Sequence, residues 1–413
     1  MGIVVQKYGG TSVGTIERIQ RVADRIISYK AAGHQMVVVV SAMGKSTDVL
    51  VDMAKQLDAQ PSAREMDMLL TTGEQVSIAL LAMALHAKGH EAVSLTGWQA
   101  GITTEPAHGK ARIKNIDNDR MLRELEAGKV VIVAGFQGVT DDGEITTLGR
   151  GGSDTTAVAL AASLQAEKCE IFTDVSGVYT ADPRVVPAAQ KLDAISYDEM
   201  LELANLGAGV LHPRSVEAAK KHGVALVVRS SFTDEEGTYV QEGNQMETGR
   251  VVSGVAHDED VAKITVVGMP AQVGTLSRLF NTLASHNVNV DIIIQSSYDA
   301  KETNISFTVS GTDLPNALKT LEANRGELGF EKVEYEEALT KVSIVGSGMV
   351  NNPGVAAEMF RELAEQKISI KMVSTSDIKV SCVIASEYTQ KAVRSLHSVF
   401  KLDAQQTAVV HGV

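Results

Sequence analysis

Residues 3–12 read Ile3-Val4-Val5-Gln6-Lys7-Tyr8-Gly9-Gly10-Thr11-Ser12, a short apolar run followed by a lysine, two glycines and two hydroxyl residues. The β-branched run predicts a buried strand, and the apolar residues at helical spacing in Ile16 to Ala31 predict a helix after it. In such a turn, glycine amides can approach phosphate oxygens while a lysine supplies positive charge. The stretch predicts an α/β fold whose first turn holds a phosphate; the alternative is a tight turn with a solvated Lys7.

The same alternation of short apolar runs and amphipathic segments continues to residue 230. Further buried strands are predicted at Met36 to Val40, Ala92 to Leu95, Val130 to Ala134, Cys169 to Thr173 and Ala225 to Arg229. Further helices are predicted at Gln75 to Ala87, Asp154 to Leu164 and Ser215 to Lys221, and Gly33, Gly89 and Gly223 are stop signals. Strands alternating with helices predict a three-layer αβα domain with a mostly parallel sheet.

A change in composition at Thr233 to Arg250, where acidic, amide and glycine residues crowd together, predicts the end of this domain. Beyond it the chain repeats itself: the offset that aligns Gly354 with Gly274 also aligns Phe360 with Phe280. Each copy has the strand and helix order of a ferredoxin-like βαββαβ unit. We predict domains at 1–245, 263–337 and 338–413, with 246–262 as a linker whose run Val251 to Ala256 can supply the closing strand of the second copy.

The charge and cysteine content of the chain argue against several classes of function. The chain has 413 residues with 38 Lys plus Arg against 51 Asp plus Glu, and its net charge of -13 argues against nucleic acid as a partner. Its two cysteines, Cys169 and Cys382, have no Cys or His partner at metal-ligand spacing, so neither a zinc site nor a disulfide is indicated. Without a signal peptide or an apolar stretch long enough to cross a bilayer, we expect a cytoplasmic protein that binds no membrane.

Polar residues follow two further apolar segments. Ser41 and Thr47 come after the second predicted strand, at the edge of a parallel sheet where open α/β folds bind ligands. They are candidate substrate contacts; the alternative is that Ser46 or Thr47 caps the next helix. Glu74 opens the apolar segment Val76 to Leu85, so we expect it at the start of a buried helix, where it caps the dipole or receives a substrate ammonium.

The densest signal is Leu148-Gly149-Arg150-Gly151-Gly152-Ser153-Asp154-Thr155-Thr156. Arg150 suits bidentate recognition of a carboxylate, and Ser153 with neighbouring amides at a helix N-terminus suits an oxyanion. The alternative is an ordinary helix N-cap with an exposed arginine. The segment Thr173 to Arg184 also leaves a strand end, where its polar groups can hold ribose and base while Arg184 meets phosphate; alone, it would pass for a long surface turn.

With these segments in chain order, the sequence resembles the aspartate kinases of the amino acid kinase family over essentially its whole length. The resemblance rests on the segments at 7–12, 72–74, 149–154 and 173–174 and on the C-terminal pair of ACT-type repeats. It implies an amino acid kinase fold followed by two ACT-type domains. It also implies transfer of the γ-phosphoryl group of Mg-ATP to the β-carboxylate of L-aspartate, the first step of the pathway to lysine, diaminopimelate, threonine and methionine.

The resemblance assigns roles to individual residues. It implies that Lys7 stabilises the transferring phosphoryl group with the turn glycines, that Asp154 orients Lys7, that Arg150 binds the α-carboxylate and that Glu74 binds the α-ammonium. The full implied ATP site is Lys7, Tyr8, Gly9, Gly10, Thr173, Asp174, Tyr179, Asp182 and Arg184. The implied aspartate site is Ser41, Thr47, Glu74, Arg150, Gly151, Gly152 and Ser153. Mg²⁺ is expected to be held largely by the phosphates, without a dedicated set of protein ligands.

One position departs from the family pattern, because Gly209 stands where several members place a second phosphate-contacting lysine. The ACT-type pair implies that lysine, threonine or both bind at the interface of the repeats and inhibit. The implied effector contacts are Gly274, Leu276, Asn289, Asp291, Gln295, Asn352, Pro353, Ser369, Ile370 and Ser374. The alternative is that these residues serve only as ordinary loop and core residues, and the sequence favours neither interpretation. The resemblance also implies a homo-oligomer, or a mixed complex with a shorter regulatory polypeptide that starts near Met246.

Two other functions share part of this pattern of residues. Acetylglutamate or glutamate kinase would also present a carboxylate to ATP, but an acylated amine offers no ammonium to Glu74. A non-catalytic amino-acid sensor would keep the fold and the repeats, but the intact Lys7, Arg150 and Asp154 argue against it.

Overall fold

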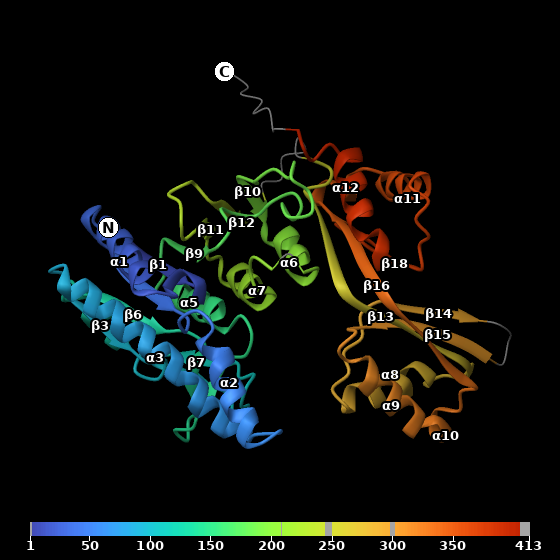
Figure 1. Ribbon diagram of the computed structural model, residues 1–413, viewed down its shortest axis with the longest axis horizontal. Coiled ribbons are helices and arrows are strands. Elements are labelled where there is room, and N and C mark those ends of the chain that lie inside the picture. Colours follow the sequence, from blue (N-terminus) through green and yellow to red (C-terminus); the bar gives the residue numbers. More distant parts are fainter. Residues whose placement is uncertain (1, 208, 244–249, 298–301, 405–413) are drawn as a thin grey trace. The chain divides into compact units, whose positions relative to one another are not determined.

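The computed structural model describes residues 2–207, 209–243, 250–297 and 302–404 (Figure 1). The chain forms two compact units. The first comprises Met1–Val178, Lys191–Asn205 and Gly209–Gln245, and the second comprises Tyr179–Gln190, Leu206–Ala208 and Met246–Val413. Two short segments, Tyr179–Gln190 and Leu206–Ala208, thus belong to the second unit. The domain bounds given above from the sequence remain a prediction.

The first unit is built on an eight-stranded sheet with the order β10-β12-β11-β9-β1-β2-β6-β3. All neighbours are parallel except β11 and β12, which confirms the mostly parallel sheet. The six predicted strands are present as β1 (Ile3–Tyr8), β2 (Gln35–Val40), β3 (Ala92–Leu95), β6 (Val130–Ala134), β9 (Lys168–Thr173) and β11 (Leu226–Ser230). Near the other edge, β10 (Ala194–Ser196) and β12 (Thr238–Gln241) complete it.

Strand β12 lies inside the segment 233–250, where the change in composition predicts the end of the domain. Its residues alternate, because Thr238 and Val240 are buried while Tyr239 and Gln241 are exposed. This period-2 pattern covers four residues, too few to stand out among the surrounding polar residues.

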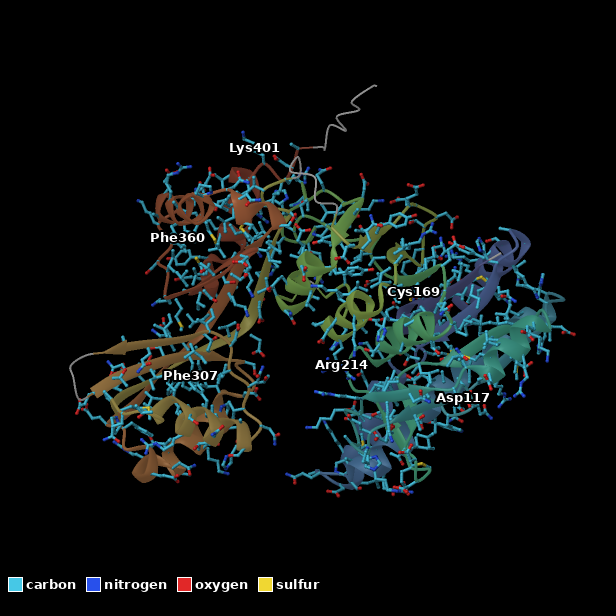
Figure 2. The ribbon with its side chains drawn as sticks, turned by 180° about the vertical axis from the view of Figure 1, so that it is seen from behind. Asp117, Cys169, Arg214, Phe307, Phe360 and Lys401 are labelled. Atoms are coloured by element: carbon cyan, nitrogen blue, oxygen red, sulfur yellow. The ribbon has the colours of Figure 1, made fainter. Side chains whose placement is uncertain are left out.

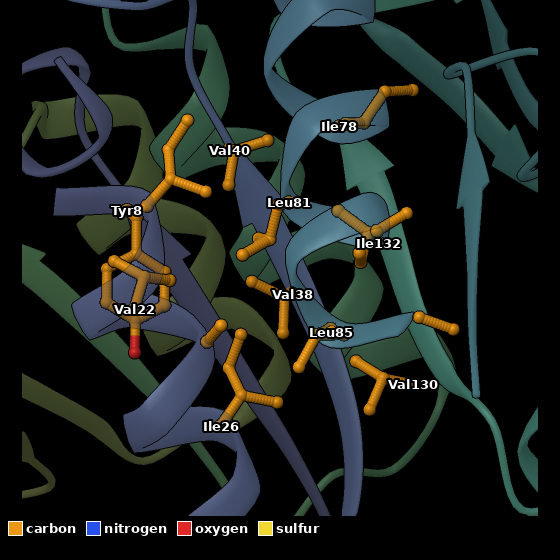
Figure 3. Close-up of a cluster of buried hydrophobic side chains, with 14 of the residues drawn as sticks. Tyr8, Val22, Ile26, Val38, Val40, Ile78, Leu81, Leu85, Val130 and Ile132 are labelled. Atoms are coloured by element: carbon orange, nitrogen blue, oxygen red, sulfur yellow. The ribbon is translucent and has the colours of Figure 1, made fainter. Parts of the chain in front are cut away.

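Helices α1 (Ile16–Ala31) and α3 (Ala63–Ala87) cover one face of the sheet. Figure 3 shows Val22 and Ile26 of α1 and Leu81 and Leu85 of α3 converging on strand residues such as Val38. Among the described residues, α3 is the one helix long and apolar enough to cross a membrane. Half of its apolar window is buried inside the first unit, as in the core helix of a globular domain.

The opposite face is covered by α5 (Gly152–Ser163), against which α7 (Pro213–His222) packs. Nine of the twelve α5 residues are buried, so this helix is enclosed on nearly all sides. Three further helices that the sequence analysis did not predict are α2 (Ser46–Leu57), α4 (Asp119–Glu126) and α6 (Tyr197–Asn205). A small sheet, β5-β4-β7-β8, is formed by Ile113–Ile116, Ile102–Thr104, Gln137–Val139 and Ile145–Thr147.

The second unit contains both repeats, joined by one antiparallel sheet with the order β14-β15-β13-β16-β18-β17. The first repeat contributes β14 (Ile293–Ser297), β15 (Glu302–Val309), α8 (Thr275–Ser285), α9 (Leu314–Ala323) and the short α10 (Arg325–Leu328). The second contributes β17 (Met372–Ser376), β18 (Lys379–Ala385), α11 (Val355–Glu365) and α12 (Thr389–Val399). Phe307 and Phe360, labelled in Figure 2, belong to the separate cores of the first and second repeat.

Two long strands serve both repeats, β13 (Gly254–Pro270) and β16 (Lys332–Val345). The start of β13 pairs with the end of β16, with Gly254 opposite Val345 and Ala256 opposite Ser343, so residues 254–256 of the run at 251–256 lie beside a strand of the second copy. The register shifts between Asp258 and Lys263, where one repeat passes into the other. Ala338 in β16 has a φ of 52°, a left-handed value that marks the same transition.

Candidate active site

Lys7 and Tyr8 point to opposite faces of β1 because side chains alternate along a strand. Tyr8 is fully buried and stacks on Phe172, with ring centroids 4.7 Å apart. Lys7 points to the face covered by α5, where its Nζ lies 2.6 Å from Oδ1 of Asp154. Both partners of this ion pair are largely buried, with side-chain exposures of 13% and 12%. Asp154 therefore fixes the lysine ammonium at the carboxyl end of the sheet.

The turn after β1 is packed against the loop after β2. A Cβ on Gly10 would lie 2.8 Å from the Ala42 carbonyl oxygen, so any other residue would displace this loop. The amide of Gly44 donates to the carbonyl oxygen of Gly10 over 2.9 Å. Gly9 is more open, since the nearest atom to its Cβ position is the Lys7 Nζ at 3.5 Å. The glycine pair thus lets backbone approach the lysine ammonium closely.

Glu74 lies in the middle of α3, so the expectation that it starts a helix and meets the helix dipole is wrong. The helix begins eleven residues earlier, at Ala63, and continues through Gly73. A Cβ on Gly73 would lie 2.8 Å from the Cβ of Ala42. This glycine therefore serves close packing rather than a break in the helix.

The Glu74 carboxylate is 3% exposed, and its Oε1 accepts a hydrogen bond from the Ala42 amide over 3.1 Å. Its Oε2 has no hydrogen-bond partner among the described residues. Burial raises the pKa of Glu74 to about 7, although the Ala42 hydrogen bond acts in the other direction. A buried, half-satisfied carboxylate of this kind is suited to receive a cation.

Two predicted substrate contacts meet directly, because Ser41 Oγ donates to Ser153 Oγ over 3.0 Å. Ser41 follows β2 and Ser153 lies in the first turn of α5, so two distant segments converge at the sheet edge. A Cβ on Gly135 would lie 2.6 Å from Ser153 Oγ, which shows how tightly β6 passes this hydroxyl. Thr47, by contrast, lies in the first turn of α2 and is half-buried.

Arg150 is exposed and forms no hydrogen bond or ion pair with any described residue. It stands between Gly149 and Gly151, whose φ values of 77° and 67° are left-handed. A Cβ on Gly151 would lie 2.1 Å from the His212 ring, so the turn requires glycine for both conformation and space. The arginine is thus held on a tightly constrained turn with its guanidinium free.

Phe136 is a neighbour of this site that the sequence did not single out. It follows β6 with a φ of 71°, and its amide donates to Thr156 Oγ1 over 3.1 Å. A Cβ on Gly152 would lie 2.8 Å from its ring. Its signal in the sequence is its position one residue after Gly135 at a strand end.

A model of the amino acid kinase family matches residues 2–230, and an ACT domain model matches residues 264–324 and 342–400. An aspartokinase from Bacillus sp. (strain MGA3) is 60% identical over 402 residues, which cover 97% of this chain and 98% of the relative. The chain belongs to the aspartokinases.

Solved structures of this family have the same fold. E. coli aspartokinase III in complex with aspartate and ADP (R-state) aligns with a TM-score of 0.82 at 29% identity, covering 96% of this chain and 99% of that chain. The same enzyme in complex with lysine and aspartate (T-state) aligns with a TM-score of 0.75 at the same identity and coverage. The amino acid kinase fold and the ACT-type pair predicted from the sequence are therefore confirmed for this aspartokinase.

The residues predicted for ATP are divided between the two units. In the first unit Thr173 ends β9 and Asp174 follows it, and Thr173 Oγ1 donates to Asp174 Oδ1 over 3.1 Å. Tyr179, Asp182 and Arg184 belong to the second unit. The Arg184 guanidinium donates three hydrogen bonds to the Asp182 carboxylate, the shortest 2.7 Å, and this pairing holds the pKa of Asp182 below its usual value.

The segment Tyr179–Gln190 is anchored in the second unit by side chains of α12. Thr180 Oγ1 lies 2.9 Å from Nε2 of His397, a residue that is only 2% exposed. Arg394 Nε donates to the Val185 carbonyl oxygen over 2.8 Å. Ala181 and Val186 belong to the hydrophobic core of the second repeat. The regulatory half therefore holds three of the predicted nucleotide residues.

The residues predicted for an effector lie in two equivalent regions of the repeats. Gly274 and Gly354 precede α8 and α11 with left-handed φ values of 93° and 102°, as expected for a repeated unit. Most of the predicted contacts are exposed, among them Leu276, Asn289, Gln295, Asn352, Pro353 and Ser369, whereas Ile370 and Ser374 are half-buried. Asp291 forms an ion pair with Lys341 of β16.

Proposed function

We propose that this aspartokinase phosphorylates the β-carboxylate of L-aspartate with ATP, giving 4-phospho-L-aspartate and ADP. The observation that carries the proposal is the buried Glu74 carboxylate, whose Oε2 is without a partner among the described residues. An α-ammonium group would satisfy this oxygen, and an acylated amine would not. This favours aspartate over N-acetylglutamate, in agreement with the aspartate-bound relative.

The chain's residues act by positioning and charge. We assign the α-carboxylate of aspartate to the free guanidinium of Arg150, whose planar fork matches a carboxylate. The substrate β-carboxylate is ionised at neutral pH and attacks directly, so no general base is needed. Lys7, fixed by Asp154, stabilises the negative charge on the transferring phosphoryl group. The Gly9-Gly10 turn allows backbone to approach the same group.

For the nucleotide, the proposal extends to Mg²⁺. Among the described residues there is no group of three or more His, Cys, Asp or Glu side chains that could hold a metal ion. Mg²⁺ commonly keeps its waters and binds one or two carboxylates together with substrate phosphates. The described residues fit an Mg²⁺ ion that is held by the nucleotide phosphates. When bound, the ion would neutralise phosphate charge.

Regulation is proposed to act through the second unit. Lysine, threonine or both would bind the ACT-type repeats at the residues predicted above. Because α12 holds the segment 179–190, a change in the repeats would reach Tyr179, Asp182 and Arg184 directly. The lysine-bound relative supports lysine as one effector.

We propose a cytoplasmic homo-oligomer, or a mixed complex with a shorter regulatory polypeptide starting at Met246. Met246 lies outside the described residues, so the structure gives no account of its surroundings.

The test is ADP release by the purified protein with Mg-ATP, with aspartate, glutamate and N-acetylglutamate compared and with lysine and threonine added singly and together. We expect turnover with aspartate alone and inhibition by at least one effector. Turnover with N-acetylglutamate but not aspartate would favour the alternative kinase, and none with any substrate would favour a sensor.

A further inference from the structure

Asp67 is a fully buried carboxylate in α3, more than one helical turn before Glu74, and no role assigned so far uses it. An ionised carboxylate in such a place is costly unless all its oxygens are paired. Here Oδ1 accepts from Thr147 Oγ1 at 2.5 Å and from the Gly109 amide at 3.1 Å. Oδ2 accepts from the same amide at 3.0 Å and lies 2.9 Å from His108 Nδ1.

These partners come from two separate segments that Asp67 ties together. Thr147 ends β8, three residues before Arg150, and His108 with Gly109 lies in the loop between β4 and β5. The two segments are also joined directly, since the Ala111 amide donates to the Thr147 carbonyl oxygen over 2.9 Å. The carboxylate is therefore the centre of a cluster at the base of the Gly149–Arg150 turn.

The loop then limits the conformation of the turn itself. A Cβ on Gly149 would lie 2.9 Å from the Gly109 carbonyl oxygen, so the loop passes directly against the residue before Arg150. From the other side Arg214, labelled in Figure 2, donates to the Leu148 carbonyl oxygen over 2.6 Å and to the Ala111 carbonyl oxygen over 3.1 Å. Leu148 directly precedes the turn, and Ala111 lies in the loop between β4 and β5.

The Arg150 side chain forms no hydrogen bond or ion pair with any described residue, so its placement depends on this backbone scaffold. Small displacements of a group that orients a substrate can cost large factors in rate. We propose that Asp67 is a positioning residue for aspartate binding, which holds the Thr147 and Gly109 segments so that the Arg150 guanidinium meets the substrate carboxylate. The proposal rests on the role given to Arg150 in the proposed function.

The test compares Asp67→Asn with Asp141→Asn as a matched control, because Asp141 is an exposed acid of the same region whose ion-pair partner is Lys114. We expect Asp67→Asn to raise the KM for aspartate about ten-fold, with the KM for ATP unchanged. A second variant, His108→Ala, removes one partner from a half-exposed position and should shift the same constant in the same direction. It keeps the test decisive if Asp67→Asn does not fold.

A double-mutant cycle separates positioning from a general structural role. In an Arg150→Ala background, Asp67→Asn or His108→Ala should add almost nothing to the KM for aspartate. The proposal would be overturned if the KM effects of the two substitutions added in full, or if the KM for ATP rose as much as the KM for aspartate. Either result would be compatible with aspartate turnover by the unmodified chain. Absence of that turnover in the natural chain would instead overturn the proposed function and this inference with it.

Discussion

The amino-acid side and the nucleotide side of the proposed active site are held by different parts of the chain. Glu74, Ser153 and the Lys7–Asp154 pair lie in the first unit, and each is fixed by neighbours from the same sheet and its helices. The segment that carries Tyr179, Asp182 and Arg184 is fixed by α12 and the core of the second repeat. The residues proposed for aspartate binding and phosphoryl transfer thus belong to the first unit, while three of the residues predicted for ATP belong to the second.

This division suggests where regulation acts. Two sites are coupled when a ligand at one changes the stability of a state that the other requires. Effector binding in the second unit would first alter the segment 179–190, which that unit holds, rather than Glu74 or Lys7. We therefore expect inhibition to appear in the KM for ATP before it appears in the KM for aspartate.

The largest expected effect is in the first unit, at Lys7. Lys7→Ala removes the ammonium that Asp154 fixes 2.6 Å away and leaves that acid largely buried without its partner. Loss of one such charge-stabilising donor lowers kcat by about 10²- to 10³-fold. Steady-state kinetics with Mg-ATP and aspartate measure it, with Lys30→Ala, at a position outside the site, as the control. An unchanged kcat would remove Lys7 from the chemistry.

The next effect is a pH dependence set by Glu74. Its pKa is raised to about 7, so in the free protein the carboxylate is neutral below pH 7 and charged above it. Only the charged form pairs with an ammonium, so kcat/KM for aspartate should fall about ten-fold per pH unit below 7 and level off above it. Glu74→Gln should give a lower, flat profile between pH 6 and 8 (roughly one unit either side of that pKa). A profile that keeps its inflection in this variant would assign the ionisation elsewhere.

These two residues also show what the sequence could and could not predict. The strand alternation and the Gly-Gly pair predicted the phosphate turn, and the side of β1 that Lys7 occupies follows from the same alternation. The position of Glu74 within its helix could not be predicted, because Gly73 resembles a helix breaker. Glycine is required at position 73 because its Cβ position lies against Ala42. These residues are 31 positions apart in sequence, so no local pattern reveals the contact.

The nucleotide side was less predictable for a related reason. Tyr179, Asp182 and Arg184 follow Thr173 and Asp174 closely in sequence, which suggested one continuous loop of the kinase domain. Their division between units depends on packing against residues more than 200 positions away, such as His397. Asp67 was missed because a single acid in a helix has no signature until its partners from two distant segments are seen.

The smallest expected effect tests the nucleotide side, at the contact between Thr180 and His397. Burial lowers the pKa of His397, so its ring is neutral at pH 7 and can share one hydrogen bond with the Thr180 hydroxyl. His397→Ala removes this bond and should loosen the segment 179–190. We expect the KM for ATP to rise about three- to ten-fold, the effect of one hydrogen bond of about 1 kcal/mol, and inhibition by lysine or threonine to weaken.

The decisive feature of this last variant is its selectivity. Because Glu74 and Arg150 lie in the first unit, His397→Ala should leave the KM for aspartate unchanged, and so should the control His222→Ala at an exposed position of α7. A rise in the KM for aspartate equal to that for ATP would mean that the two sides of the site do not respond independently. Inhibition that persists at full strength would show that the effector signal reaches the kinase unit by another route than α12.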